Sequence, residues 1–168
     1  MSHHKNNIQD VRSIPKYYEI ALKKNGYFDE QGVLRKEFIL DYSVTVAKKL
    51  CNTSPRMTST QLRNYYHHVK AACATFQKNR TLDNDVAERV LQNEILALKA
   101  KVKSCRGKNI QKGDSSLPKA FEEFIDDNLS VIEKNPDKRL VAKAIAEGFL
   151  PHFECIVGYF KYYEPKRR

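Results

Sequence analysis

LQNEILALKAKVKSC, residues Leu91 to Cys105, is the stretch whose spacing decides the fold of this chain. Its apolar residues recur at intervals of three and four positions, at Leu91, Ile95, Leu98, Val102 and Cys105. That period places them along one face of an α-helix, whereas a strand requires strict alternation. The pattern therefore predicts an amphipathic helix that ends near Cys105.

Four further segments carry a helical pattern, and no stretch alternates for long enough to predict a strand. TSTQ at residues 58–61 has the capping-box sequence, and Pro118 stands where a first-turn proline opens a helix. The expected helices span about residues 33–50, 58–78, 83–105, 118–134 and 137–163. The last is apolar on nearly all sides, which indicates a central position, with a kink expected at Pro151. The predicted fold class is all-α, a compact bundle of about five helices.

The first 32 residues are polar and contain the turn-like stretch NGYFDEQG (residues 25–32). We expect residues 1–32 to form a partly mobile N-terminal arm, with at most a short helix near Tyr17 to Leu22. Residues 33–168 are expected to form a single helical domain. The chain lacks a signal-peptide pattern, a membrane-spanning stretch and any CxxC pair, so we expect a cytoplasmic protein with reduced thiols.

Charge is the unusual feature of the composition. The chain has 30 Lys and Arg against 20 Asp and Glu, a formal net charge of +10. Such a surplus favours a nucleic acid, an anionic membrane surface or an acidic protein as partner. Binding to a membrane surface is the weaker use of this charge, because it needs a helix with Trp or Phe opposite Lys or Arg, and the chain has no Trp.

The basic residues gather in KAKVKSCRGKNIQKG, Lys99 to Gly113, which holds six bases and no acid. The stretch is expected to leave the helix at Gly107 and continue as a basic loop. On a helical wheel Lys99, Lys103 and Arg106 fall on one shoulder of the apolar stripe, and Lys101 falls on the other.

A second set of bases shares one face of the helix at 58–78, at Arg63, His67 and Lys70. The segment 118–134 instead holds five acids against two bases. This separation of sign along the chain favours binding of a polyanion. The candidate nucleic-acid contacts are Arg63, Lys70, Lys99, Lys101, Lys103, Arg106 and Lys108. The aromatic clusters at 65–66 and 159–163 are expected to belong to the core more than to base-stacking platforms.

Enzyme motifs are missing from the sequence. There is no Walker loop, no GxGxxG and no HExxH, and the adjacent His67 and His68 point about 100° apart on a helix. We therefore expect no catalytic residue, no metal and no cofactor. Glu154 lies within the most apolar helix, so we expect a buried structural carboxylate paired with a base such as Arg63.

Five stretches, in order along the chain, resemble the small subunit of type III-A CRISPR effector complexes, the Csm small-subunit family. They are NGYFDEQGVLRKEFI (25–39), TSTQLRNYYHHVKAA (58–72), ALKAKVKSCRGKN (97–109), LPKAFEEFID (117–126) and FECIVGYFKYY (153–163).

The resemblance implies a compact, non-catalytic helical protein present in several copies, which stack as an inner filament beside the backbone and large subunits of the complex. It also implies contact with the guide–target RNA duplex through basic positions, which in this chain fall on Arg63, Lys99, Lys101 and Lys108. Lys103 and Arg106 are additions of this chain. A lysine stands at Lys108 where the family often has arginine, and it supplies a point charge without a bidentate fork.

Both lines of reasoning favour a structural subunit that binds the RNA backbone and reads A-form shape, while base pairing reads sequence. The alternative is a purely protein-binding adaptor whose basic face meets an acidic protein.

Overall fold

The computed structural model describes residues 12–112, 117–135 and 137–166, with side chains throughout except at 107–112 and 138. The helices are α1 (Lys16–Asn25), α2 (Asp41–Asn52), α3 (Ser59–Asn79), α4 (Asn84–Lys112), α5 (Lys119–Glu133), α6 (Lys138–Lys143) and α7 (Leu150–Tyr163). A single isolated bridge, Phe28 to Leu34, is the only β pairing among the described residues. The all-α prediction is confirmed.

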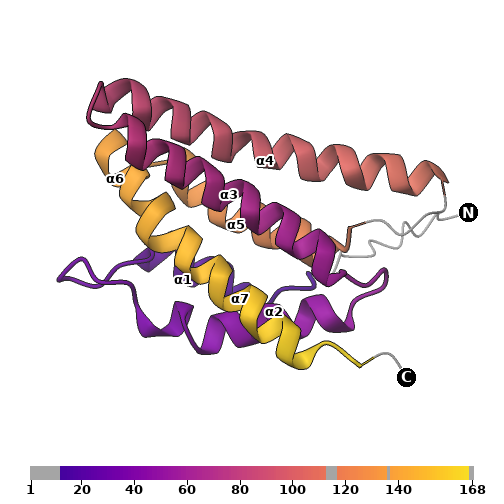
Figure 1. Ribbon diagram of the computed structural model, residues 1–168. Coiled ribbons are helices and arrows are strands. Elements are labelled where there is room, and N and C mark those ends of the chain that lie inside the picture. The colour runs from indigo at the N-terminus through magenta and orange to yellow at the C-terminus, as the bar shows by residue number, and fades with distance from the viewer. Residues whose placement is uncertain (1–11, 113–116, 136, 167–168) are drawn as a thin grey trace, which may run out of the picture.

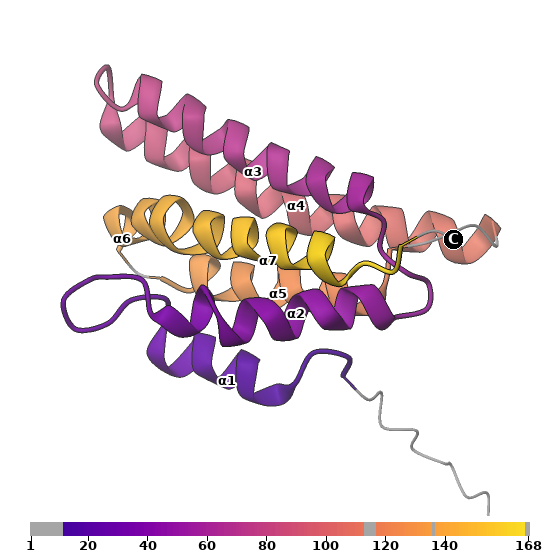
Figure 2. The same cartoon turned by 60° about the horizontal axis from the view of Figure 1, so that its bottom comes forward.

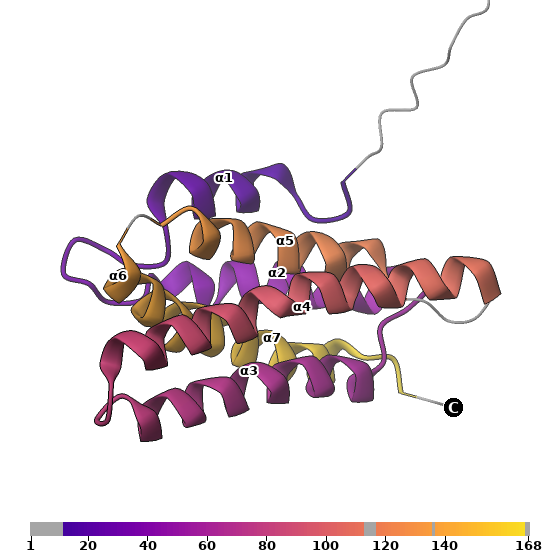
Figure 3. The same cartoon turned by 90° about the horizontal axis from the view of Figure 1, so that it is seen from above.

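The helices pack in layers (Figure 1). Helices α3 and α4 lie side by side in one outer layer, α5 and α7 lie beneath them, and α2 follows (Figure 2). Helix α1 packs on α5 at the side of the molecule away from α3, as Figures 2 and 3 both show. Helix α3 therefore lies between α4 and α7, with its outer surface free of other described helices (Figure 1).

Local sequence determines where α3 begins. The Thr58 hydroxyl accepts a hydrogen bond from Gln61 N at 3.1 Å, and Gln61 Oε1 accepts one from Thr58 N at 3.0 Å. The predicted capping box is confirmed. It satisfies two of the backbone donors that a helix start leaves without partners.

Two predicted boundaries are wrong. The segment predicted as a helix from residue 33 begins instead with a 3₁₀ turn at Lys36–Phe38, and α2 starts only at Asp41. Helix α4 does not stop near Cys105 but continues through Gly107 to Lys112, so the expected loop is helical over its first half. An isolated glycine costs a helix only about 1 kcal/mol, and the residues around Gly107 form helices well enough to offset it.

The last helical segment runs without a break from α6 to α7. A π-helical turn at Ala144–Phe149 joins them and ends two residues before Pro151, where the sequence predicts a kink. Proline removes a backbone donor, and a wider turn accommodates that loss without ending the helix. The segment packs against α2, α3, α4 and α5, which fits the central position predicted for it.

His152 lies at the centre of a buried polar network between four elements. Its Nδ1 lies 2.7 Å from Phe38 O, which only accepts, so Nδ1 carries the proton. Its Nε2 therefore accepts from the Tyr18 hydroxyl at 2.8 Å. The Tyr18 oxygen in turn accepts from Asn128 Nδ2 at 2.8 Å, and Asn128 Oδ1 accepts from the Tyr27 hydroxyl at 2.7 Å. Both ring nitrogens of a neutral histidine are thus satisfied.

From Arg12 onward, the segment predicted as a polar arm is part of the packed body. Ile14, Tyr18, Leu22 and Tyr27 are at most 2% exposed. Tyr18 and Leu22, four positions apart, give α1 an apolar face that packs on α5. The part of the predicted arm that precedes Arg12 lies outside the described residues.

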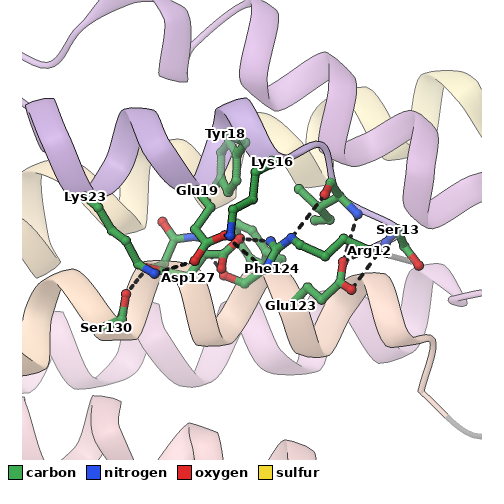
Figure 4. Close-up of polar contacts among 12 residues, drawn as sticks. Arg12, Ser13, Lys16, Tyr18, Glu19, Lys23, Glu123, Phe124, Asp127 and Ser130 are labelled. Carbon is green, nitrogen blue, oxygen red and sulfur yellow. Dashed lines mark hydrogen bonds and ion pairs between the residues drawn. The ribbon is translucent and has the colours of Figure 1, made fainter. Parts of the chain in front are cut away.

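Charged groups fasten the same segment to α5 (Figure 4). Arg12 Nη2 lies 2.5 Å from Asp127 Oδ2, and its Nη1 lies 3.4 Å from Glu19 Oε2. The Glu123 carboxylate accepts from Ile14 N at 2.8 Å and from Ser13 N at 3.0 Å. Burial raises the pKa of Asp127 to about 6, although Arg12 opposes the shift. Two of the carboxylates that the fold buries, Glu123 and Asp127, therefore lie on α5 and hold this segment.

Candidate nucleic-acid interface

One shoulder of α4 faces the acidic surface of α5. Lys99 Nζ lies 3.6 Å from Glu133 Oε2, and Lys103 Nζ lies 3.0 Å from Glu122 Oε1 and 3.1 Å from Asp126 Oδ2. Arg106 also pairs with Glu122 through Nε. Hydrogen bonds to Glu122 and then to Asp126 raise the pKa of Lys103.

These ion pairs show that the charge separation seen along the sequence is not kept in the folded chain. Bases and acids that are separated along the sequence are brought together between α4 and α5, so their fields largely cancel at this shoulder. A phosphate that approaches Lys103 or Arg106 must compete with carboxylates that the fold already supplies. The three shoulder residues are thus occupied in the free chain.

Lys101 lies on the opposite shoulder, toward α3. Its ammonium group stands 5.6 Å from the ring centroid of Tyr65, and its side chain is exposed. It lines a niche of about 250 Å³ together with Gln61, Asn64, Tyr65, Cys105 and Leu117. The ring limits the positions that the lysine can take while leaving its charge accessible.

Helix α3 supplies the other exposed bases. Its residues 59–79 include no acid. Arg63, His67 and Lys70 are exposed along its outer surface, and the Lys70 ammonium group lies 5.8 Å from the Tyr66 ring centroid. Among the described residues, neither Arg63 nor Lys70 nor Lys101 forms an ion pair. These three positive charges are not neutralised by a described carboxylate, in contrast to those of the α5-facing shoulder.

Tyr65 and Tyr66 of α3 each lie beneath the ammonium group of a lysine, Lys101 and Lys70 respectively. Both rings are 7% exposed, so the prediction that they belong to the core is confirmed. Tyr65 packs on Phe121 of α5 and Tyr66 on Phe153 of α7. Because the rings are fixed in the core, Lys101 and Lys70 rest on rigid supports on opposite sides of Arg63 and His67.

The prediction that Glu154 is buried is wrong. Its side chain is exposed, and no ion pair joins it to a described base such as Arg63. The buried face of α7 is formed by His152, Phe153 and Ile156, which turns Glu154 outward toward Tyr66. Burial, and then the neighbouring Glu154 carboxylate, raise the pKa of Tyr66 to about 12.

Lys108 lies in the last part of α4, and its side chain is outside the described residues. No group of three or more His, Cys, Asp or Glu side chains within the described ranges is placed to hold a metal ion. No described helix is long and apolar enough to cross a membrane.

Comparison with known protein families shows to which family the chain belongs. A family model described as Csm2 Type III-A matches residues 35–166. The chain belongs to the Csm2 type III-A family. It is accordingly a small structural subunit of a type III-A CRISPR Csm complex, which assembles with other Csm subunits. No curated protein and no solved structure matches the chain significantly.

The Csm2 match covers α2 to α7 and every basic residue predicted from the sequence. The segment that forms α1 precedes it. The surface of α3 with Lys101 therefore lies wholly within the part of the chain that defines the Csm2 family, and α1 is fastened to that part by Arg12 and its partners.

Proposed function

We propose that this Csm2 subunit is a non-catalytic RNA-binding component of its complex, in the cytoplasm, and that the surface of α3 with Lys101 contacts the backbone of the guide–target RNA duplex. The observation that carries this proposal is the acid-free outer surface of α3. Arg63, Lys70 and Lys101 present charges there that no described carboxylate neutralises. Such a surface attracts phosphates of any sequence, which suits a subunit that must accept every target.

The proposal ranks the predicted bases. Arg63, Lys70 and Lys101 are available without rearrangement, whereas the carboxylates paired with Lys99, Lys103 and Arg106 weaken the attraction of these bases for a phosphate. Further copies of the chain, stacked as an inner filament beside the backbone and large subunits, would repeat the surface along the duplex. Individually weak contacts then add up through multivalency.

A non-catalytic role agrees with the state of the histidines. His152 is fully buried with both nitrogens hydrogen-bonded, so it cannot reach a substrate. His68 lies 3.8 Å from Glu94 at the edge of α4, and His67 is exposed without a described catalytic partner. Proton transfer requires a histidine within reach of both a reacting group and a partner that orients it.

The test is a salt titration of target-RNA binding by assembled complexes that carry Arg63→Ala or Lys101→Ala, each with two unrelated guides. We expect weaker binding with both guides and a slope of log affinity against log salt that is shallower by roughly 0.7–0.9 per lost phosphate contact. Lys103→Ala is the matched control, and its slope should change less because Glu122 and Asp126 already hold that lysine.

Two results would contradict the proposal. A loss confined to one guide would indicate base readout. An unchanged salt slope combined with dissociation of the complex would favour the alternative function, a protein-binding adaptor without RNA contact.

A further inference from the structure

Helix α7 carries an aromatic groove that the duplex-binding surface does not use. It has a volume of about 650 Å³ and is lined by Ile39, Cys155, Gly158, Tyr159, Tyr162 and Tyr163. Tyr162 is 79% exposed and Ile39 41% exposed. A tyrosine this exposed is not a core residue, so the prediction for the cluster at 159–163 fails at this position.

Two rings form perpendicular walls of the groove. The centroids of Tyr162 and Tyr163 lie 4.9 Å apart with an interplanar angle of 88°. Gly158 has no side chain, and a Cβ built there would meet no atom within 4 Å. The result is an open slot beside an exposed ring face, which is a suitable shape for a flat aromatic guest.

Positive charge borders this groove. The Lys48 ammonium group lies 4.8 Å from the Tyr163 ring centroid, and Lys161, which precedes Tyr162 in the sequence, is exposed on α7. None of the six lining residues is acidic. Exposed tyrosine occurs in protein interfaces as well, but lysine is depleted there, whereas lysine beside a stacking ring is typical of single-stranded nucleic-acid sites.

We propose that the aromatic groove binds an unpaired nucleobase of single-stranded RNA, which stacks on Tyr162 while Lys48 and Lys161 meet the adjoining phosphates. The inference rests on the proposed RNA-binding function and adds a second class of contact to it. The surface of α3 with Lys101 meets duplex phosphates, whereas this groove requires a base that is free to leave the helical stack. Segments of RNA beyond the guide–target duplex have such bases.

The experiment measures binding of the full chain to two fluorescent RNAs, a single-stranded oligouridylate and a blunt duplex of equal length, by anisotropy across a salt series. Tyr162→Ala should weaken single-strand binding about 5- to 100-fold and leave duplex binding unchanged. Its salt slope should stay that of the wild type, because stacking releases no counterion. Tyr162→Phe keeps the ring and should bind normally.

Gly158→Leu is the second variant, since it fills the slot from a position with free space and raises helix propensity, so the chain should still fold. It should reproduce the loss seen with Tyr162→Ala. If single-strand affinity is unchanged in both variants, or if duplex and single strand lose affinity equally, the inference is overturned.

The outcome for the proposed function is separate. Duplex binding that depends on Lys101 while the wild-type chain ignores the single strand would leave that function intact and reject the groove as a base site. If Tyr162→Ala instead releases the subunit from its complex without any effect on RNA, the groove is a protein interface and the inference is wrong.

Discussion

His152 shows at the scale of one residue how the interior depends on a proton. Burial lowers the pKa of His152 to about 4, and the hydrogen bond to Phe38 O only partly opposes this shift. The folded chain keeps the ring neutral, whereas the unfolded chain binds a proton near its ordinary pKa of 6.5. The contribution of His152 to stability is therefore complete above about pH 6.5 and declines as pH falls toward 4.

We expect the free energy of unfolding to lose up to about 3 kcal/mol from this group across that window. Asp127 acts in the opposite direction, because its raised pKa favours the folded state as pH falls toward 4. Urea unfolding of the wild type and of His152→Gln at several pH values separates the contribution of His152 from that of Asp127. The variant should be less stable at pH 7.5 and should lack the histidine's share of the decline. Parallel pH profiles for the two proteins would show that His152 is not held neutral.

His152 and Glu154 also show how much of the environment of a single residue can be predicted from the sequence. An apolar stretch predicts that the helix is buried, and it is. Because the stretch is apolar on nearly all sides, however, it does not determine which side of the helix faces the core. His152 and Glu154, two positions apart, therefore differ in burial in a way that the sequence does not reveal. The histidine is buried within the network, while the carboxylate that was expected there faces outward.

Helix α1 illustrates the scale of the element, because an ion pair from Arg12, in the segment just before the helix, helps to join it to α5. Arg12→Ala leaves Asp127, which is 5% exposed, without its cation. We expect a loss of about 2–3 kcal/mol at pH 8, since breaking a buried pair strands the remaining charge. The loss should be smaller at pH 5, where a carboxyl with a raised pKa is protonated.

Urea unfolding at both pH values checks this, with Lys24→Ala, an exposed base of α1, as the control. Asp127→Asn in the Arg12→Ala background should restore part of the stability at pH 8 and remove the difference between the Arg12→Ala losses at the two pH values. An Arg12→Ala effect of equal size at both pH values would mean that Asp127 stays ionised without its partner.

Two glycines of the last helical segment provide a second test at this scale. A Cβ added at Gly148 would lie 2.7 Å from Cγ of Tyr27, a fully packed ring, whereas one at Gly158 meets nothing within 4 Å. Gly148→Ala should therefore destabilise the fold by about 1–3 kcal/mol. Gly158→Ala should be neutral or stabilise by up to about 1 kcal/mol. Thermal unfolding compares them, and similar effects for both would show that Tyr27 moves aside easily.

The elements also mark what the sequence determines and what it leaves open. The stripe through Leu91 and Ile95 predicts α4, and the Thr58 capping box predicts the start of α3, because both signals are local. The pairing of α4 with α5 depends on tertiary packing, so no local pattern reveals that Lys103 meets Glu122. The docking of α1 is likewise decided by Glu123 and Asp127, more than one hundred residues away.

At the scale of the whole molecule, the fold determines which of the positive charges behind the net charge of +10 remain unneutralised at the surface. The acids of α5 neutralise one shoulder of α4, and the surface of α3 with Lys101 keeps its charge. Because bases far apart in sequence meet on this surface while neighbours such as Lys101 and Lys103 face apart, the candidate site follows from the fold more than from the basic stretch. Neutralising the α5 acids that pair with α4 should therefore strengthen RNA binding more than the change in net charge alone would.

Glu122→Gln combined with Asp126→Asn releases Lys103 and Arg106 from their described carboxylates. The side chains in these pairs are 23–49% exposed, so solvent screens them and the fold should lose only about 1 kcal/mol for each. Binding of RNA by the variant should strengthen for every sequence, and the salt slope should steepen by about 0.7–0.9 for each base that gains a phosphate. The matched control is Glu30→Gln with Glu37→Gln, which changes the net charge equally before α2, away from the α4–α5 contact. An equal gain in both proteins would mean that only total charge matters, and no gain in the first would place this shoulder away from the RNA.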